Sequence, residues 1–219
     1  MNPEYYQRQV IDILHAEVVE QDFYNIQAFA KRGVELDTII DLGANIGFFT
    51  VMAHSLYPWT RILAIEPYLP SFYQLTQNCD GLNNIELINK AYGDGNKVDI
   101  KENGPSPTCC YAVPGLSTES VRLKDLSFDR SKPYMIKSDC EGAESYFYTG
   151  EDFEIVQGAS IVSMEGHYPP NSQGVFNSIP FYDFIQRLSV THQTLFFEDI
   201  TAHYITKYIA IRKDLRLPW

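Results

Sequence analysis

Charged side chains follow two apolar runs in the second half of the chain. Lys137, Asp139 and Glu141 form the first group and Glu165 with His167 the second, and each group ends a run that is typical of a buried strand. A carboxylate or an imidazole can take a proton from a hydroxyl nucleophile, and a lysine can bind the oxyanion that forms. These residue types predict proton transfer at neighbouring strand ends. The structural alternative is an ion-pair network around Lys137.

Two further questions about these groups stay open in the sequence. Asp139 and His167 are alternative general bases, since an imidazole titrates near neutral pH and a carboxylate is also a proton acceptor. Carboxylate and imidazole groups also bind Mg²⁺ or Mn²⁺, which can lower the pKa of a bound hydroxyl. Because spacing alone defines no coordination geometry, a divalent metal is the less favoured alternative, and no metal ligands are assigned.

A glycine-containing turn, Asp41-Leu-Gly43-Ala-Asn45-Ile-Gly47, follows the first β-branched run of the chain. Gly43 lets the backbone approach a ligand, and Gly47 lets a helix pack closely on a strand. A dinucleotide-binding turn has a glycine where this chain has Asn45. The carboxylate of Asp41 also suits a cationic ligand better than a diphosphate.

Glu66 ends the second apolar run, 25 residues after Asp41. An acidic residue at this place in an α/β sheet accepts hydrogen bonds from ribose hydroxyls. A glycine turn and a ribose-binding acid without phosphate-binding groups indicate a nucleoside with an amino-acid-like tail, which describes S-adenosylmethionine. The structural alternative is that the glycines only form a turn and that Glu66 only caps the next helix.

Five motifs occur in one order along the chain: Asp41–Thr50, Ala64–Pro67, Asn89–Asp94, Ile136–Glu144 and Met164–His167. In this order they resemble the FkbM family of S-adenosylmethionine-dependent methyltransferases. The resemblance implies a class I methyltransferase fold and methyl transfer to a hydroxyl of a sugar, polyketide or related natural product.

The resemblance also implies roles for individual residues. It implies that the cofactor's methionine and ribose side is bound by Asp41, Gly43, Asn45 and Gly47. Glu66 is then expected to hold the ribose hydroxyls, and Ala91 and Tyr92 to border the adenine. Asp139 lies nearer the expected methyl group than His167, and Lys137 would bind the oxyanion. We expect Glu141, Glu165 and Tyr111 to contact the acceptor.

The elements that must position these residues alternate between strand and helix. Apolar runs that are nearly continuous are typical of a parallel sheet covered on both faces. We therefore predict an α/β fold, a doubly wound and mostly parallel Rossmann-like sheet with an antiparallel C-terminal strand, and the resemblance to FkbM implies that this sheet is of class I methyltransferase type. The predicted strands are 37–41, 61–65, 84–89, 97–102, 120–124, 133–138, 159–164, 193–198 and 203–212, and the predicted helices are 48–56, 71–79, 143–149 and 181–188. A loop or hairpin is expected between 103 and 115.

Length and composition restrict the remaining possibilities. We predict that the 219 residues form one methyltransferase domain, with a helical segment at 1–33 and a Rossmann-like core at 34–219. A net charge of −11 argues against nucleic acid as a partner, because that affinity comes from clustered Lys and Arg. The apolar runs are shorter than the ~20 residues of a membrane span, and the polar start resembles no signal peptide. We expect a cytoplasmic protein without membrane contact, whose N-terminal helix covers the cofactor or forms a homodimer face.

The leading hypothesis is an S-adenosylmethionine-dependent O-methyltransferase that acts on a hydroxyl of a small molecule or glycan. The first alternative is a protein that binds S-adenosylmethionine without turnover and acts as a scaffold. An NAD-dependent oxidoreductase is the second alternative.

Overall fold

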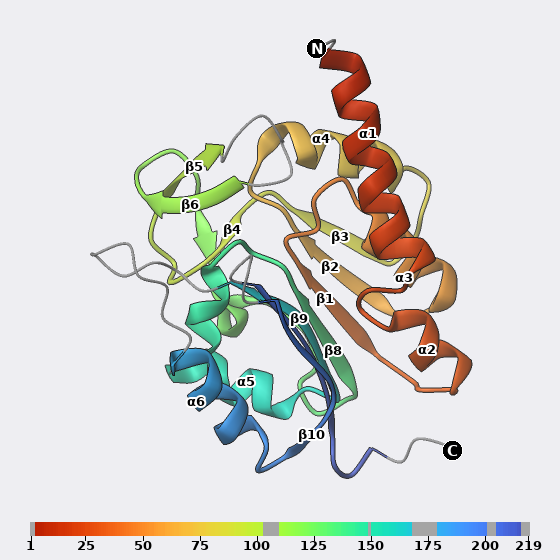
Figure 1. Ribbon diagram of the computed structural model, residues 1–219, viewed down its shortest axis with the longest axis vertical. Coiled ribbons are helices and arrows are strands. Elements are labelled where there is room, and N and C mark those ends of the chain that lie inside the picture. Colours follow the sequence, from red (N-terminus) through yellow and green to blue (C-terminus); the bar gives the residue numbers. More distant parts are fainter. Residues whose placement is uncertain (1–2, 103–109, 149, 168–178, 201–204, 216–219) are drawn as a thin grey trace.

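A seven-stranded sheet forms the centre of the molecule (Figure 1). The computed structural model describes residues 3–102, 110–148, 150–167, 179–200 and 205–215. The strand order is β10-β11-β9-β8-β1-β2-β3, and every neighbouring pair is parallel except those that involve β11. The strands are β1 (Thr38–Leu42), β2 (Arg61–Ile65), β3 (Ile85–Ile88), β8 (Tyr134–Ser138), β9 (Ile161–His167), β10 (His192–Ile200) and β11 (Ile205–Arg212). The predicted doubly wound sheet of class I methyltransferase type, with an antiparallel C-terminal strand, is confirmed.

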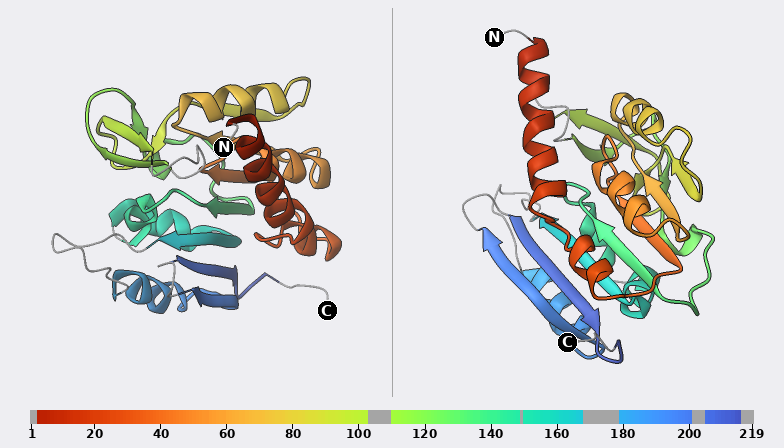
Figure 2. Two further views of the ribbon diagram at one scale, coloured as in Figure 1. Left: turned by 45° about the horizontal axis from the view of Figure 1, so that its top comes forward. Right: turned by 90° about the vertical axis from the view of Figure 1, so that its right-hand side faces the viewer.

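Helices cover both faces of this sheet (Figure 2). One face carries η1 (Ala16–Glu20), α2 (Ile26–Lys31), α3 (Phe48–Leu56) and α4 (Leu69–Asn78), while α1 (Pro3–His15) continues from η1 and its N-terminal end projects beyond the sheet. The other face carries η3 (Ala143–Tyr148), α5 (Gly150–Gly158) and α6 (Ile179–Leu188). The short turn η2 (Leu123–Asp125) contacts α5. The expected helical segment at the N-terminus therefore forms part of one covering layer.

The core is split into two layers by the alternation of side chains along the strands. Ile39 of β1 packs in the cluster under α2 and α3, and its neighbour Ile40 packs in the cluster under α5 and α6. Met135 and Ile136 of β8 divide in the same way. Because successive strand residues point to opposite faces, a strand buried on both faces must be apolar almost throughout. This explains why the strands appeared in the sequence as continuous apolar runs.

Two small sheets stand beside the main one. β4 (Ala91–Tyr92) pairs with β7 (Ser120–Val121) in parallel. β5 (Val98–Glu102) and β6 (Cys110–Pro114) form an antiparallel hairpin, drawn in light green in Figure 1. The expected hairpin between 103 and 115 thus begins earlier, at residue 98; residues 103–109 lie outside the described part of the chain.

Two predicted elements were wrong in detail, and one helix was missed. The segment 143–149 forms a 3₁₀ helix at Ala143–Tyr148, and the strand predicted at 120–124 stops at Val121 and continues as the 3₁₀ turn η2. Helix α5 was not predicted. Its apolar periodicity is weak because Asp152 is buried within it and accepts hydrogen bonds from the Tyr92 hydroxyl (2.9 Å) and the Leu123 amide (3.2 Å). A polar residue at a buried helix position breaks the apolar pattern from which a helix is predicted. The distant residues that satisfy Asp152 cannot be recognised from the sequence.

Among the helices in the described ranges, none combines the length and the apolar character that crossing a bilayer requires. The limits of the predicted domain stay a prediction.

Candidate active site

The turn after β1 brings three chain segments together. The Gly43 and Ala44 amides donate to the Ile65 carbonyl at 3.0 and 2.9 Å. Gly43 has a φ of +73°, and a Cβ at this position would lie 1.8 Å from the Asp139 carbonyl oxygen. Only glycine fits both the left-handed backbone and this contact. The turn therefore lies directly against the end of β8, which carries the predicted catalytic residues.

Glu66 connects this turn to the start of α4. One carboxylate oxygen accepts a hydrogen bond from the Asn45 amide (2.8 Å) and the other from the Tyr68 amide (2.7 Å). The side chain is 6% exposed, and this burial raises the pKa of Glu66 to about 7, although both amides oppose the shift. Glu66 is thus a buried carboxylate that titrates near neutral pH.

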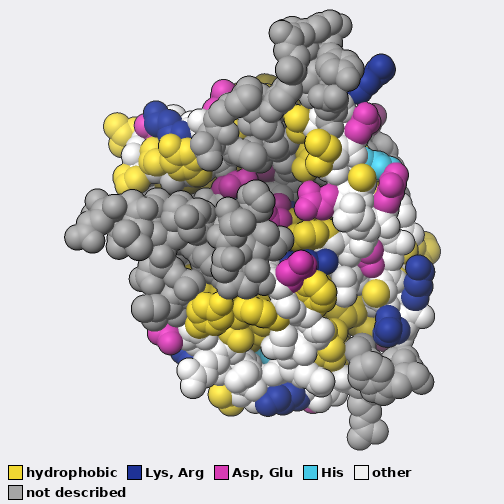
Figure 3. Space-filling model, viewed as in Figure 1, with side chains coloured by type: hydrophobic (Ala, Val, Ile, Leu, Met, Phe, Trp, Pro, Cys, Tyr) yellow, Lys and Arg dark blue, Asp and Glu magenta, His cyan; other side chains and the backbone are white. Residues whose placement is uncertain are grey.

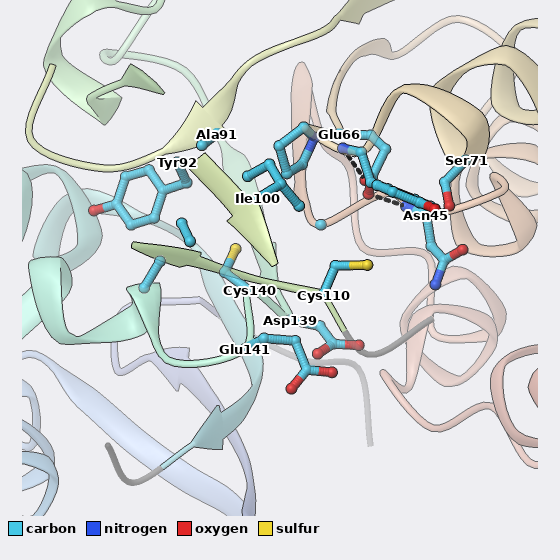
Figure 4. Close-up of a pocket in the computed structure, with 15 residues that line it drawn as sticks. Asn45, Glu66, Ser71, Ala91, Tyr92, Ile100, Cys110, Asp139, Cys140 and Glu141 are labelled. Atoms are coloured by element: carbon cyan, nitrogen blue, oxygen red, sulfur yellow. Dashed lines mark hydrogen bonds between the residues drawn. The ribbon is translucent and has the colours of Figure 1, made fainter. Parts of the chain in front are cut away.

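A hollow opens beside these groups, with an empty volume of about 610 Å³ including its mouth (Figure 4). Five of the residues predicted to bind the cofactor line it: Gly43, Asn45, Glu66, Ala91 and Tyr92. Two of them do not. Asp41 is fully buried beneath the turn, and Gly47 packs against Leu75 of α4, where a Cβ would lie 2.7 Å from a leucine methyl carbon. These two residues shape the turn from below.

Asp139, Cys140 and Glu141 all line the same hollow. Alternation along a strand would place Ser138 and Cys140 on one side and the two carboxylates on the other, and the structure keeps this separation although β8 ends at Ser138. The Cys140 sulfur lies 3.6 Å from the Ser138 hydroxyl, and Figure 4 shows it pointing away from the Asp139 and Glu141 carboxylates. Glu141 has a φ of +52° and Gly142 one of +105°, so the chain turns sharply here. Figure 4 shows the Asp139 and Glu141 carboxylates close to each other.

Glu144 holds this turn and was assigned no role from the sequence. Its carboxylate accepts hydrogen bonds from the Cys140 amide and from the Gly142 amide, the latter at 2.8 Å. The side chain has no exposed surface. In the sequence, only its position at the end of the motif Ile136–Glu144 pointed to a role for Glu144.

Lys137 lies below the hollow and does not line it. Its ammonium group is 3.0 Å from an Asp41 carboxylate oxygen and donates to the Gly43 carbonyl at 2.6 Å. The second Asp41 oxygen accepts a hydrogen bond from the Thr50 hydroxyl at 2.6 Å. The lysine side chain is 4% exposed and that of Asp41 is fully buried. The buried pair joins β8 to β1 and holds the glycine turn, as the structural alternative predicted.

His167 lies at the end of β9 among carboxylates. Its Nε2 atom is 3.4 Å from Glu165 and 3.5 Å from Glu141, and its Nδ1 atom is 3.6 Å from Glu144. Burial alone would lower the pKa of His167, but Glu144 and Glu165 raise it well above its ordinary value. Burial raises the pKa of Glu141 to about 7. The imidazole therefore keeps its proton near neutral pH and acts as the cation of this cluster.

Asp139, Glu141 and His167 each place one potential ligand atom within 4.8 Å of the others. Glu165 is close to His167 but does not belong to this group. Magnesium prefers oxygen ligands in near-octahedral order, and a protonated imidazole already balances part of the same negative charge. The arrangement is compatible with a divalent cation, and a metal stays the less favoured alternative.

Tyr24 is a site residue that the sequence did not indicate. Its hydroxyl donates to the Asp139 carboxylate at 2.9 Å, and its carbonyl accepts a hydrogen bond from the Ser163 hydroxyl at 3.1 Å. The residue is 3% exposed, and its ring lies 5.0 Å from the Lys137 ammonium. Tyr24 and Asp139 are 115 positions apart, so no spacing pattern could pair them.

We expect Tyr24→Phe to lower the turnover of methyl transfer by at least about tenfold, because an Asp139 carboxylate without its donor leaves the productive orientation. The free energy of unfolding should fall by only about 1 kcal/mol, since the ring stays in place. Turnover, urea unfolding and S-adenosylhomocysteine affinity are the measurements. Tyr57→Phe is the matched control, because the buried Tyr57 hydroxyl has no hydrogen-bond partner among the described residues and lies in the same apolar cluster. Equal turnover in both variants would contradict the role of Tyr24.

Tyr111 was expected to contact the acceptor, and it does not line the hollow. It lies in β6 with 41% of its surface exposed, while its neighbours Cys110 and Ala112 line the hollow. Because side chains alternate along β6, Tyr111 lies on the opposite face of the strand from Cys110 and Ala112.

Acidic side chains gather near the middle of the face in Figure 3, between the hairpin and α1. The segment that follows β9, residues 168–178, lies outside the described residues.

Comparison with known proteins supports the resemblance inferred from the motifs. No model of a known protein family matches the chain. A 66-residue segment is 33% identical to the 31-O-demethyl-FK506 methyltransferase FkbM of Streptomyces tacrolimicus. The match covers 29% of this chain and spans about a quarter (25%) of that relative's length. The resemblance to FkbM is confirmed over this segment.

Similar solved structures have lower sequence identity. A SAM-dependent methyltransferase from Aquifex aeolicus has a TM-score of 0.46 and 10% identity, with 96% of this chain and 99% of that chain covered. EvdMO1 has a TM-score of 0.47 and 17% identity, with 87% of this chain and 40% of that chain covered. The fold assignment above depends on the strand order of the chain itself.

Proposed function

We propose that this protein is an S-adenosylmethionine-dependent methyltransferase that moves a methyl group to a hydroxyl of a small molecule or glycan. One observation carries the proposal. A single hollow at the carboxyl ends of β1, β2 and β8 is lined by a glycine turn and a buried carboxylate, Glu66, together with Asp139 and Glu141. Ligands of open α/β sheets bind at these strand ends.

Glu66 is the proposed ligand of the ribose hydroxyls. Its two oxygens already accept one amide each, and a carboxylate has about four acceptor positions, so both oxygens can accept further bonds. Asn45, whose side-chain oxygen is buried and finds no hydrogen-bond partner in the described part of the chain, is the proposed contact of the methionine part together with Gly43. Ala91 and Tyr92 are proposed to border the adenine. Asp41 and Gly47 act indirectly, by supporting the turn.

The proposed reaction is an in-line displacement. The acceptor oxygen attacks the methyl carbon, the carbon–sulfur bond breaks, and S-adenosylhomocysteine leaves as a neutral thioether. The hydroxyl proton passes to a base of the protein. Positioning and exclusion of water can supply much of the rate, because the reacting atoms need only be held about 3–3.5 Å apart and in line.

Asp139 is the proposed base. It lines the hollow, whereas His167 does not and already carries a proton near neutral pH. His167 would instead fix the negative charge of Glu141 and Glu165, which stay the proposed acceptor contacts. Lys137 was expected to bind an oxyanion; because its ammonium is engaged by Asp41 and the Gly43 carbonyl, we propose that it holds the turn.

The acceptor is proposed by analogy. The name of the FkbM relative describes an O-methyltransferase, and that activity supports an oxygen acceptor here. A homodimer stays a prediction.

Titration calorimetry with S-adenosylhomocysteine and with NAD tests the cofactor. We expect binding of S-adenosylhomocysteine and none of NAD; the reverse result would establish the oxidoreductase alternative. Incubation with methyl-labelled S-adenosylmethionine and panels of glycosides, polyketides and phenols tests turnover. Binding without transfer to any panel would favour the scaffold alternative.

Binding of S-adenosylhomocysteine should depend on pH through Glu66. The ribose hydroxyls donate to the ionised carboxylate, and with a pKa of about 7 its ionised fraction rises from about one tenth at pH 6 to about nine tenths at pH 8. The association constant should therefore rise by about tenfold between these values, as calorimetry can measure. Glu66→Gln should bind weakly and without this dependence. A flat profile for the unmodified protein would contradict the assignment of Glu66.

A further inference from the structure

The β5–β6 hairpin has two faces of different character. Ile100 pairs with Ala112 across the two strands, and Lys101 pairs with Tyr111. Because side chains alternate along a strand, the first pair and the second pair point to opposite sides. Tyr111 is exposed on the outer face.

The inner face of the hairpin borders the hollow. Ile100, Cys110 and Ala112 line it together with Glu66 and Tyr68. Figure 4 shows Ile100 beside Glu66, on the opposite side of the hollow from Glu141. The inner face thus presents the apolar side chains of Ile100 and Ala112 to the hollow, next to the proposed ribose ligand.

A hydrogen bond ties this inner face to the rim of the hollow. Glu102 lies on the same side of β5 as Ile100, and its carboxylate accepts a hydrogen bond from the Tyr68 hydroxyl at 2.5 Å. This bond, more than burial, raises the pKa of Tyr68 to about 12. Tyr68 directly precedes α4, so the tether connects the hairpin to the segment that holds Glu66.

The base of the hairpin is also fixed. Val98 and Thr118 exchange two backbone hydrogen bonds of 2.8 Å. The Asp99 carboxylate accepts hydrogen bonds from the Leu116 and Ser117 amides, both at 3.1 Å. These contacts hold the hairpin as a wall of the hollow.

We propose that the inner face of the β5–β6 hairpin binds the adenosine part of the cofactor. Ile100 and Ala112 supply apolar contact to the purine and ribose, and the Tyr68–Glu102 hydrogen bond holds them at that distance. This inference rests on the proposed function. It moves the hairpin from the acceptor site, where the sequence placed it, to the cofactor site.

Calorimetry with two probes tests the proposal: S-adenosylhomocysteine, and 5′-methylthioadenosine, which lacks the amino-acid tail. Ile100→Ala removes three carbon atoms from the contact and should weaken both probes by about tenfold. Tyr68→Phe removes only the tether and should weaken both by about threefold to tenfold. The matched controls Tyr111→Ala and Lys101→Ala change the outer face and should bind both probes as the unmodified protein does.

Three results would overturn the proposal. If Ile100→Ala and Tyr68→Phe bind both probes within about twofold of the unmodified protein, the hairpin makes no contact with the cofactor. If only S-adenosylhomocysteine is weakened, the hairpin contacts the amino-acid tail instead. If Tyr111→Ala weakens binding equally, the effect is not specific to the inner face. Failure of the unmodified protein to bind S-adenosylhomocysteine would instead refute the proposed function. Thermal unfolding of each variant shows that the fold is retained.

Discussion

Lys137→Met is expected to lower the free energy of unfolding by about 3–5 kcal/mol, because it leaves the Asp41 carboxylate buried without its cation. Asp41 has no exposed surface, and the Lys137 ammonium is its ion-pair partner at 3.0 Å. Methionine has nearly the shape of the lysine side chain without its charge. Loss of packing therefore contributes little, and the change measures the cost of the unpaired carboxylate.

Urea unfolding of two further variants makes this test specific. Lys132→Met removes the cation of a pair with Asp37 in which the lysine side chain is 55% exposed, and it should cost less than about 1 kcal/mol. The double variant Asp41→Leu with Lys137→Met removes both charges and should be more stable than Lys137→Met alone. A Lys137→Met protein as stable as Lys132→Met would show that water or another cation reaches Asp41. A double variant that is less stable than Lys137→Met would show that packing dominates.

Asp139→Asn is expected to reduce methyl transfer by about 10²–10⁴-fold while S-adenosylhomocysteine affinity stays nearly unchanged. The amide keeps the size of the side chain, and its oxygen can still accept the Tyr24 hydroxyl, which lies 2.9 Å from the Asp139 carboxylate. What it loses is the ability to take the acceptor's proton. Single-turnover transfer of a labelled methyl group, on an acceptor found in the panels, measures the chemical step separately from binding.

The comparison with His167→Asn separates the two candidate bases. His167 keeps its proton near neutral pH among Glu144, Glu165 and Glu141, so its replacement should disturb the acceptor contacts more than the proton transfer. We expect a rise in KM for the acceptor that exceeds the fall in kcat. An Asp139→Asn protein that retains turnover within about tenfold, beside a His167→Asn protein that loses it, would identify His167 as the base.

Most strands and the turn between β1 and α3 could be predicted because their signals are local. A strand covered on both faces shows a continuous apolar run, and a left-handed turn that contacts another backbone requires glycine, as at Gly43. Glu66 was identified for the same reason, since it directly follows a recognisable strand. Helix α5 was missed because Asp152, its buried acidic residue, is satisfied by β4 and by the chain after β7.

The turn at 139–142 marks the limit of pattern arguments within the site. The sequence shows three charged residues at alternate positions, and alternation along a strand would separate Cys140 from the two carboxylates. That separation is kept, but the sequence does not show that β8 ends at Ser138 and that the positive φ angles of Glu141 and Gly142 turn the chain sharply. Glu144 stabilises this turn by accepting hydrogen bonds from two of its amides, and no motif indicates these bonds.

By itself the sequence determined most of the strands and helices, the glycine turn and the position of Glu66, because each depends on side chains and backbone within a few residues. Only the tertiary structure decided that the Tyr24 hydroxyl donates to Asp139 and that Lys137 forms an ion pair with Asp41. It also decided that the hairpin places Ile100 at the hollow and Tyr111 on its outer face. These contacts join segments that are far apart in the chain. The packing of the helices on the two faces of the sheet decides which of the many polar side chains come into contact, and no local pattern shows this.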